Sequence, residues 1–352
     1  MLEAVERAPA PVSIQEIARL TGVQRLAVYR ILATLEHRGY VLRDDGKRYR
    51  AASRRRRLRF GYVAPLSGNA FREDLARSLR DAAEQGGVDL LMLDNADRDV
   101  DAATKNAEKL IEARVDAVIF FQPVESLGHV VADRLFCAHI PFITIERPIQ
   151  GGIYFGANNY QAGKMAGVVL GQFAKADWKA RFYRIVLLEP EQTNTNVHAR
   201  ITGVLLGIRS VLGEIEDARI VHLEAAAGQV ESSHRAVALL LKKTERGKRL
   251  LISGFNDLCA VGALRAVREA GRENDVAIVG QNAAREGREE IHRTGSRLIA
   301  SIAYFPEKYG MRLVQLATDL VAGRQVPPAI YTSHVVLDRR NIEFYYPRGD
   351  AS

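Results

Sequence analysis

Cysteine is scarce in this sequence, with only Cys137 and Cys259 among 352 residues. Both lie in apolar surroundings and far apart in the chain, so two buried thiols are a simpler interpretation than a disulfide or a metal-binding pair. The eight histidines do not cluster at metal-ligand spacing. We therefore expect no metal and no other cofactor.

Long apolar runs are also missing. A membrane-spanning helix needs about 18 or more consecutive apolar residues, and no window of the chain approaches that length. The N-terminus, MLEAVERAPAPVSIQEIARL, carries acidic residues early and has no apolar segment followed by a small-residue cleavage site. We therefore expect no secretory signal, no membrane partner and a cytoplasmic location.

The familiar motifs of catalysis are absent as well. We find no GxGxxG after a strand, no GxxxxGKS/T phosphate loop, no GxSxG and no HExxH. These absences argue against an enzyme. An enzyme that acts on a sugar or a nucleotide with a doubly wound core stays as an alternative.

Net charge is missing from most of the chain and concentrated at one end. The first 59 residues hold 14 Lys and Arg against 6 Asp and Glu, whereas the remaining residues hold 36 of each kind. The whole excess of +8 therefore belongs to a small N-terminal part. A basic module attached to a neutral body predicts that the module binds nucleic acid.

Residues 13–39, SIQEIARLTGVQRLAVYRILATLEHRG, have the pattern of two helices joined by a tight turn. Ser13 and Glu16 form a capping-box sequence, Gly22 suits the turn, and Gly39 suits the end of the second helix. The segment YVLRDDGKRYRAA that follows predicts a hairpin with an Asp-Asp-Gly turn. Together these elements predict a winged helix-turn-helix domain over residues 1–50.

Double-stranded operator DNA is the partner that we expect for this domain. A helix fits the major groove, and hairpin residues can contact the phosphate backbone. The basic linker after the domain, residues 51–58, can contact phosphates or enter a narrowed minor groove. The predicted DNA contacts are Gln24, Arg25, Tyr29 and Arg30 on the second helix, Arg43, Lys47 and Arg48 on the hairpin, and Arg54, Arg55, Arg56 and Arg57 in the linker. The alternatives are a helical hairpin for protein contacts and a merely solvated linker.

Over roughly residues 1–50 the chain resembles the N-terminal DNA-binding domain of IclR-type regulators, through IARLTGVQRLAVYRILATLEHRGYV and the hairpin after it. The resemblance implies a DNA-binding head. The chain departs from it at the start of the second helix, where the family usually has small hydroxyl residues and this sequence has Leu26 and Ala27. The base preference of the family therefore does not carry over.

From residue 58 onward, apolar segments of strand length alternate with amphipathic helical patterns. Continuous apolar segments such as RFGYVAP, AVIFFQP and VAIVGQN are typical of parallel sheets that are covered on both faces. About nine such segments are too many for one compact sheet. We therefore predict an α/β body of two doubly wound parallel-sheet lobes, preceded by the small winged helix-turn-helix domain.

Polar and aromatic residues follow several of these strands, where open α/β sheets bind their ligands. They are Asn69 and Phe71 after the first strand, Glu146 and Arg147 after PFITI, Asn256 after LLISGF and Asn282 after VAIVGQ. Amide, carboxylate and guanidinium groups beside an aromatic ring suit a polyhydroxylated ligand. Each residue alone also fits a turn former, a helix cap or an exposed ion pair.

Residues 58 to about 340 resemble the type I periplasmic sugar-binding proteins, especially the ribose-binding kind, and the effector domains of LacI-type repressors. The motifs that carry the resemblance are NAFREDLARSLRDAAEQGGVDLLMLD, IPFITIERP, FNDLCAVGALRAVREAG and DVAIVGQN. By position in these motifs, the resemblance adds Arg72, His198, Arg200 and Tyr304 to the candidate ligand-binding residues. Glu146, His198 and Asn282 stand where the family has Asp, Arg and Asp, so the identity of the sugar does not carry over.

The resemblance also implies how the body, residues 59–340, divides into lobes. Lobe 1 is expected to hold residues 59–160 and 305–327, and lobe 2 residues 161–304 and 328–340. Residues 341–352 are expected to form a C-terminal tail.

We interpret the chain as a ligand-responsive transcription regulator, taken as a repressor, whose sugar-like effector closes the lobes and changes the geometry of its heads. A single small head reads too few base pairs to find one site in a genome, so we expect a homodimer. Besides the enzyme named above, the alternative is a transport-associated solute-binding protein.

Overall fold

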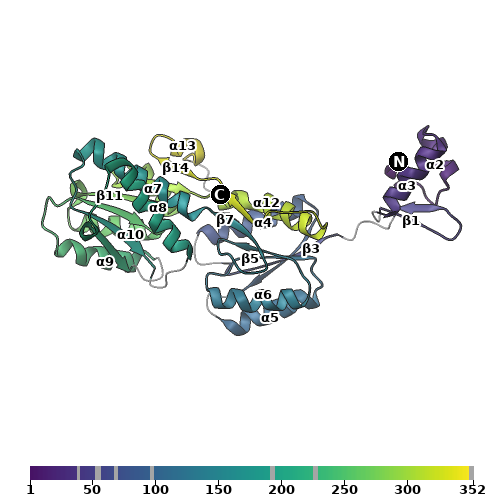
Figure 1. Cartoon of the computed structure of the whole chain (residues 1–352), viewed down its shortest axis with the longest axis horizontal. Helices are drawn as coiled ribbons and strands as arrows, with labels where there is room; N and C mark the ends of the chain where they lie inside the picture. The colour runs from purple at the N-terminus through teal and green to yellow at the C-terminus, as the bar shows by residue number, and fades with distance from the viewer. Residues whose placement is uncertain are drawn as a thin grey trace.

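The computed structural model of the chain describes residues 1–37, 40–51, 57–66, 70–95, 99–190, 195–224 and 229–348. Figure 1 shows a small head built from the first elements of the chain and two larger lobes. Each lobe is a sheet with helices on both of its faces. The predicted α/β fold class of two doubly wound lobes after a helix-turn-helix region is confirmed.

The head contains α1 (Leu2–Glu6), α2 (Ile14–Thr21), α3 (Arg25–His37), β1 (Val41–Arg43) and β2 (Tyr49–Ala51). Ser13 caps α2 as the sequence predicts: its hydroxyl accepts from the amide of Glu16, whose carboxylate accepts from the amide of Ser13. Gly22 ends α2 in a left-handed conformation, with φ of 68°. Strands β1 and β2 pair as the predicted antiparallel hairpin. The predicted helix end at Gly39 lies outside the described residues.

Lobe 1 contains β3 (Arg59–Ala64), α4 (Ala70–Gln85), β4 (Asp89–Asp94), α5 (Val100–Glu112), β5 (Ala117–Phe120), α6 (Glu125–Cys137), β6 (Phe142–Ile145), β7 (Ile153–Ala157), α12 (Tyr309–Val321) and β13 (Ala329–Thr332). Its strands are parallel and lie in the order β13-β7-β6-β5-β3-β4. Helices α4 and α12 cover one face of the sheet, and α5 and α6 cover the other (Figure 1). The inner strands β3, β5, β6 and β7 are therefore buried on both faces, as their continuous apolar sequences require, whereas the edge strands β4 and β13 are only partly buried.

Lobe 2 contains α7 (Asn159–Trp178), β8 (Arg184–Glu189), α8 (Thr195–Leu212), β9 (Ile220–Glu224), α9 (Val230–Lys242), β10 (Leu250–Gly254), α10 (Asp257–Glu269), β11 (Val276–Asn282), α11 (Arg285–His292), β12 (Leu298–Ala303), β14 (Val335–Asp338) and α13 (Ile342–Tyr345). The strands lie in the order β14-β12-β11-β10-β8-β9, and β14 runs antiparallel to β12. Helices α7 and α8 pack on one face, and α9, α10 and α11 on the other. Short 3-10 turns at Asp217–Arg219, Glu273–Asp275 and Pro306–Lys308 complete the body.

The end of the chain differs from the prediction in two places. Strand β13 pairs with β7, so the residues from 328 to 332 belong to lobe 1, although they were assigned to lobe 2. Pro327 and Pro328 were predicted to mark a crossing between the lobes. The chain instead begins the edge strand β13 of lobe 1 directly after them. Residues 341–346 are no free tail, because Ile342 is buried in the core of lobe 2 and Tyr346 packs against that core.

The two cysteines differ in exposure. Cys259 is buried in lobe 2, as predicted, whereas Cys137 is exposed. Cys137 is the last residue of α6 and follows Phe136, which is exposed as well. Within the described ranges, no helix combines the length and apolar character needed to cross a membrane.

Helices α7 and α8 approach each other along glycines. A Cβ atom on Gly163 would lie 2.0 Å from the carbonyl oxygen of Arg200, and one on Gly203 would lie 2.2 Å from that of Tyr160. The two backbones are therefore in direct contact, and no side chain fits between them. This contact fixes the N-terminal halves of both helices against each other.

The chain crosses between the lobes after β7, after β12 and after β13. His334 connects these crossings: its Nε2 accepts from the amide of Asn158 at 3.0 Å, and its ring centroid lies 4.9 Å from that of Tyr304. Burial lowers the pKa of His334 to about 4. The imidazole is therefore neutral near pH 7 and can accept the hydrogen bond.

Candidate functional site

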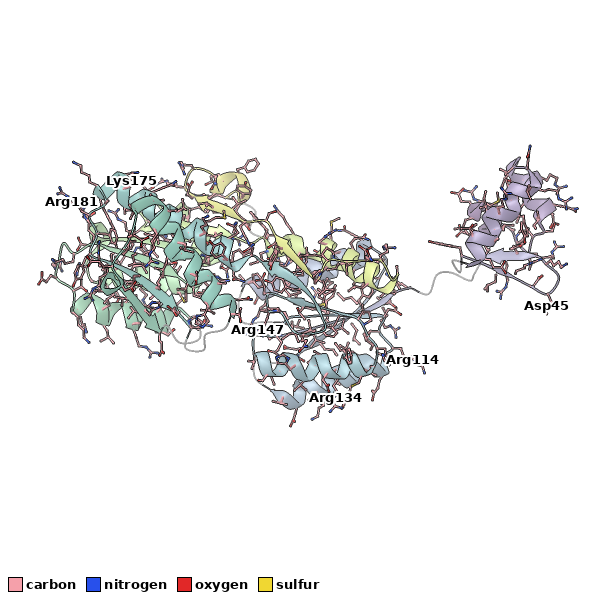
Figure 2. The ribbon with its side chains drawn as sticks, viewed as in Figure 1. Asp45, Arg114, Arg134, Arg147, Lys175 and Arg181 are labelled. Carbon is pink, nitrogen blue, oxygen red and sulfur yellow. The ribbon has the colours of Figure 1, made fainter. Side chains whose placement is uncertain are left out.

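The carboxyl ends of the strands in both lobes border a cavity of about 280 Å³. The strand order reverses between β3 and β5 in lobe 1 and between β8 and β10 in lobe 2, and open α/β sheets bind ligands at such points. Figure 2 shows Arg147 where the two lobes face each other. The lining includes Phe71, Arg72, Phe121, Glu146 and Arg147 from lobe 1, and Asn159, Asn196, Arg200, Phe255, Asn256, Asn282, Glu286 and Tyr304 from lobe 2.

Most of the predicted ligand-binding residues line this cavity, namely Phe71, Arg72, Glu146, Arg147, Arg200, Asn256, Asn282 and Tyr304. Asn69 lies outside the described residues. His198 is a correction, since it is exposed on α8 and is not part of the lining. Successive helical residues are about 100° apart, so a residue two positions from the inward-facing Arg200 lies on the opposite side of the helix.

Glu146 is held at the end of β6 by both lobes. Its Oε1 accepts from the amide of Ala157 and from the hydroxyl of Tyr309, each at 3.1 Å. Its backbone carbonyl accepts from the side-chain amide of Asn196 on α8. Burial raises the pKa of the Glu146 carboxyl to about 6, although the Arg200 charge opposes this shift. The carboxylate is thus a positioned acceptor at the border between the lobes.

Arg200 is a buried guanidinium with fixed partners. It donates through Nε to Asn159 Oδ1 at 3.1 Å and through a terminal nitrogen to the carbonyl of Phe255 at 2.6 Å. The guanidinium carbon lies 4.4 Å from the Phe255 ring centroid and 5.5 Å from that of Tyr304. The aromatic faces and the hydrogen bonds hold the charge beside the cavity.

Lobe 2 presents two acceptors at the cavity that have no partner among the described residues. Asn282 Oδ1 and Glu286 Oε2 are buried atoms without a hydrogen bond from any described residue. Asp257 holds the loop that carries them, since its carboxylate accepts from the amide of Ala284 at 2.6 Å and from the hydroxyl of Ser301 at 2.7 Å. Because a buried acceptor without a partner is costly, this corner of the cavity suits a ligand that donates hydrogen bonds.

Asn256 serves the helix as well as the cavity. Its Oδ1 accepts from the amide of Cys259 at 2.8 Å and thereby caps α10. The alternative interpretation of Asn256 was a turn former, whereas its side-chain oxygen caps a helix. The apolar wall of the cavity comes from Phe71 and Phe121, whose ring centroids are 6.0 Å apart.

The second candidate site is the outer face of α3 in the head. Gln24, Arg25, Tyr29 and Arg30 are all exposed, as contacts to DNA require. On the hairpin, Arg43 and Lys47 are exposed too. These positions allow the predicted contacts but do not by themselves test them.

Arg48 and Arg57 have partners within the protein. Arg48 donates to the carbonyl of Pro11 at 2.8 Å and pairs with Glu16 at 3.0 Å, so it joins the hairpin to α2. Arg57 donates to the carbonyl of Gly87 at 2.7 Å and lies 3.4 Å from Asp89 of lobe 1. Both were predicted to contact DNA, and both side chains stay about half exposed beside these partners, so the DNA contacts remain predictions. Arg54, Arg55 and Arg56 lie outside the described residues.

A periplasmic binding protein domain matches residues 60–325, which is well over half of the chain. The chain belongs to the periplasmic binding protein family. Residues 1–45, which precede this core, match the IclR helix-turn-helix domain. The two matches divide the chain between a head of a DNA-binding type and a periplasmic-binding-protein core.

Proteins similar to the periplasmic-binding-protein core include several that bind sugars. The D-ribose/D-allose-binding protein of Pseudomonas aeruginosa is 24% identical over 236 residues, covering 64% of this chain and 69% of that protein. The periplasmic solute-binding protein of an ABC transporter from Actinobacillus succinogenes, solved with bound D-allose, is similar with a TM-score of 0.70 and 18% identity, over 82% of this chain and 100% of that one. A Mycobacterium smegmatis protein in complex with β-D-fucofuranose has a TM-score of 0.68 and 22% identity, over 83% of this chain and 94% of that one. At these identities the solved structures show the fold alone.

Some polar residues of the periplasmic-binding-protein core were not predicted to line the cavity. Asn196 lies four positions before Arg200, and this spacing on one helix face was a signal that sequence reasoning could have used. Asn159 follows β7, a strand that was itself not predicted, and Glu286 lies in the first turn of α11. Within the described part of the chain, no three His, Cys, Asp or Glu side chains are placed to hold a metal ion.

Proposed function

We propose that the protein is a ligand-responsive, DNA-binding transcription regulator, acting as a repressor, whose effector is a sugar or a related polyhydroxylated molecule. The observation that carries this proposal is the presence, in one chain, of an IclR-type helix-turn-helix and a periplasmic-binding-protein core. A head of this kind has no use in a protein that only delivers a solute to a transporter. Because the DNA partner is in the cytoplasm, we place the protein there.

The chemistry of the cavity supports a polyhydroxylated effector. Arg147 and Arg200 offer hydrogen-bond donors, whereas Glu146, Asn282 and Glu286 offer acceptors, and a hydroxyl group can serve both kinds of partner. Phe71 and Phe121 offer an apolar face for the carbon–hydrogen side of a sugar ring. The names of the similar proteins, which mention D-ribose, D-allose and β-D-fucofuranose, support the same class.

The mechanism that we propose is closure about the three crossings. An effector that contacts residues of both lobes binds the closed arrangement more tightly and shifts the population toward it. In a homodimer, closure changes how the two lobe pairs pack and therefore the spacing of the two heads. That change alters operator affinity, because half-sites must match the spacing of the heads. The cavity and the head are then two coupled sites, as allostery requires.

The test measures both sites in one protein. Full-length protein is used to select bound sequences from a random DNA duplex pool, and thermal unfolding then screens D-ribose, D-allose, fucose and myo-inositol. We expect one of these compounds to raise the melting temperature and to change the dissociation constant for the selected duplex by about tenfold or more. The duplex should change the affinity for the compound by the same factor.

A transport-associated protein would bind the compound without any effect on the duplex. That outcome, or the failure of full-length protein to bind any duplex, would exclude the regulator. Turnover of the compound by purified protein would favour the enzyme alternative. Each alternative therefore has its own result.

The affinity for the effector should depend on pH through Glu146. Since its pKa is about 6 and the ionised carboxylate is the better acceptor, affinity should fall about tenfold between pH 7 and pH 5. Glu146→Gln should flatten this dependence, whereas Glu84→Gln, at an exposed position of α4, should leave it unchanged. Isothermal titration at several pH values checks the prediction, and an unchanged profile in Glu146→Gln would contradict it.

The same group affects the stability of the ligand-free fold with the opposite sign. The folded-state pKa lies above the ordinary value of 4.5, so the stabilising contribution of Glu146 is complete below about pH 4.5 and is lost as the pH rises through about 6. Effector binding and fold stability therefore change in opposite directions over this range, and the two measurements can be compared on one sample.

A further inference from the structure

The outer face of α3 carries apolar side chains in water. Leu26 is 64% exposed and Tyr29 is 49% exposed. With about 100° between successive helical residues, Leu26, Tyr29, Arg30 and Ala33 share one face. The opposite face is that of Val28 and Leu32, which are completely buried in the core of the head.

The described residues of the head, 1–37 and 40–51, leave this apolar surface exposed. The core of the head is built on the other side of α3 and includes Ile17, Val41 and Tyr49 as well. Among the described residues, the hairpin and α2 leave Leu26 mostly exposed. Leu26 and Tyr29 together, beside Arg30 on the same helix face, suit a partner surface with both apolar and anionic groups.

The major groove of DNA is such a surface. Phosphates supply its negative charge, and the C5 methyl group of thymine is the apolar group that base edges present there. The N-terminal residues of a recognition helix are the ones that reach base edges, and Leu26 is the second residue of α3. Arg25 and Arg30, both exposed, lie on either side of it in the sequence and complement the negative charge.

We propose that Leu26 and Tyr29 read thymine, by packing against its C5 methyl group in the major groove, while Arg30 contacts a neighbouring base or phosphate. The inference rests on the proposed DNA-binding function and makes it more specific. It predicts that each operator half-site contains a thymine at the position that the N-terminal turn of α3 contacts. A helix with small hydroxyl residues at this position would instead read polar base edges.

The test removes only the methyl group. A duplex selected by full-length protein from a random pool is made again with deoxyuridine in place of thymidine, one position at a time. Burying one methyl group is worth about 0.8 kcal/mol, so uridine at a read position should weaken binding about fourfold, and uridine elsewhere should have no effect. Fluorescence anisotropy at one fixed salt concentration gives the dissociation constants.

Variants assign the effect to the side chain. In Leu26→Ala the thymidine and uridine duplexes should bind with nearly equal affinity. Leu20→Ala is the matched control, because Leu20 is 61% exposed but lies on α2. It should keep the fourfold difference, and thermal unfolding of both variants shows whether the head stays folded.

Three outcomes would overturn the proposal, and they differ from one another. Equal binding of thymidine and uridine duplexes by the wild type would exclude methyl readout while the proposed DNA-binding function stands. A Leu26→Ala variant that keeps the difference but loses self-association would assign the surface to a contact between two heads. Failure of the wild type to bind any duplex would exclude the proposed function and this inference together.

Discussion

Replacing Arg147 with alanine is expected to weaken effector binding by at least about 100-fold. Arg147 lines the cavity from the end of β6, and Figure 2 places it where the lobes face each other. A guanidinium donates several hydrogen bonds in a fixed geometry, and bonds that involve a charged group contribute about 1.5–3 kcal/mol each. Thermal unfolding with the effector and isothermal titration measure the loss.

The control for this variant is Arg134→Ala, which removes an exposed arginine of the same lobe on α6. It should bind the effector as the wild type does. In both variants the affinity for the selected duplex without effector should stay within about threefold, because the head is unchanged. An Arg147→Ala protein that responds at the wild-type effector concentration would show that the cavity is not the sensing site.

Replacing Gly203 with valine should destabilise lobe 2 by about 3 kcal/mol. Its Cβ atom would lie 2.2 Å from the carbonyl oxygen of Tyr160 and 2.8 Å from the amide nitrogen of Lys164, so α7 and α8 must separate. The separation would also move Arg200 away from Asn159, which lies at the start of α7. We expect a fall of about 6–12 °C in melting temperature together with weaker effector binding.

Thr202→Val is the matched variant, since it introduces the same side chain at the exposed neighbouring position of α8. Its melting temperature should stay within about 2 °C of the wild type, because surface substitutions usually change stability by less than about 0.5 kcal/mol. If Gly203→Val unfolds at the same temperature as Thr202→Val, the close backbone contact between the two helices does not limit the fold.

The sequence predicted those features that depend on short-range patterns. The capping box of Ser13 and Glu16 is a local hydrogen-bond pattern, and both of its bonds are present. A continuous apolar segment is also a local pattern, and such segments form the inner parallel strands of both lobes. Arg147 and Tyr304 reach the cavity because strand ends converge there in any doubly wound fold.

Features that depend on partners distant in the sequence were not predicted. The pairing of β13 with β7 joins segments more than 170 residues apart, and no local pattern contains that information. Arg48 and Arg57 look like free basic residues in the sequence, but Glu16 and Asp89 bind them in the fold. His198 was predicted to bind ligand because of its position in a motif. Asn196 lines the cavity instead, because it lies four residues before Arg200 and therefore on the same face of α8.

The anchoring of Arg57 determines where the head is attached. Gly87 and Asp89, its partners, lie at the start of β4, and β3 begins two residues after Arg57. The head is therefore tethered at the amino end of the lobe 1 sheet, whereas the effector cavity lies at the carboxyl end. A strand of six residues separates these ends by about 20 Å. Under the proposed function, an effector in this cavity does not contact the tether, so we expect its signal to reach DNA through movement of lobe 1 as a whole, which converts a small closure into a larger displacement of the head.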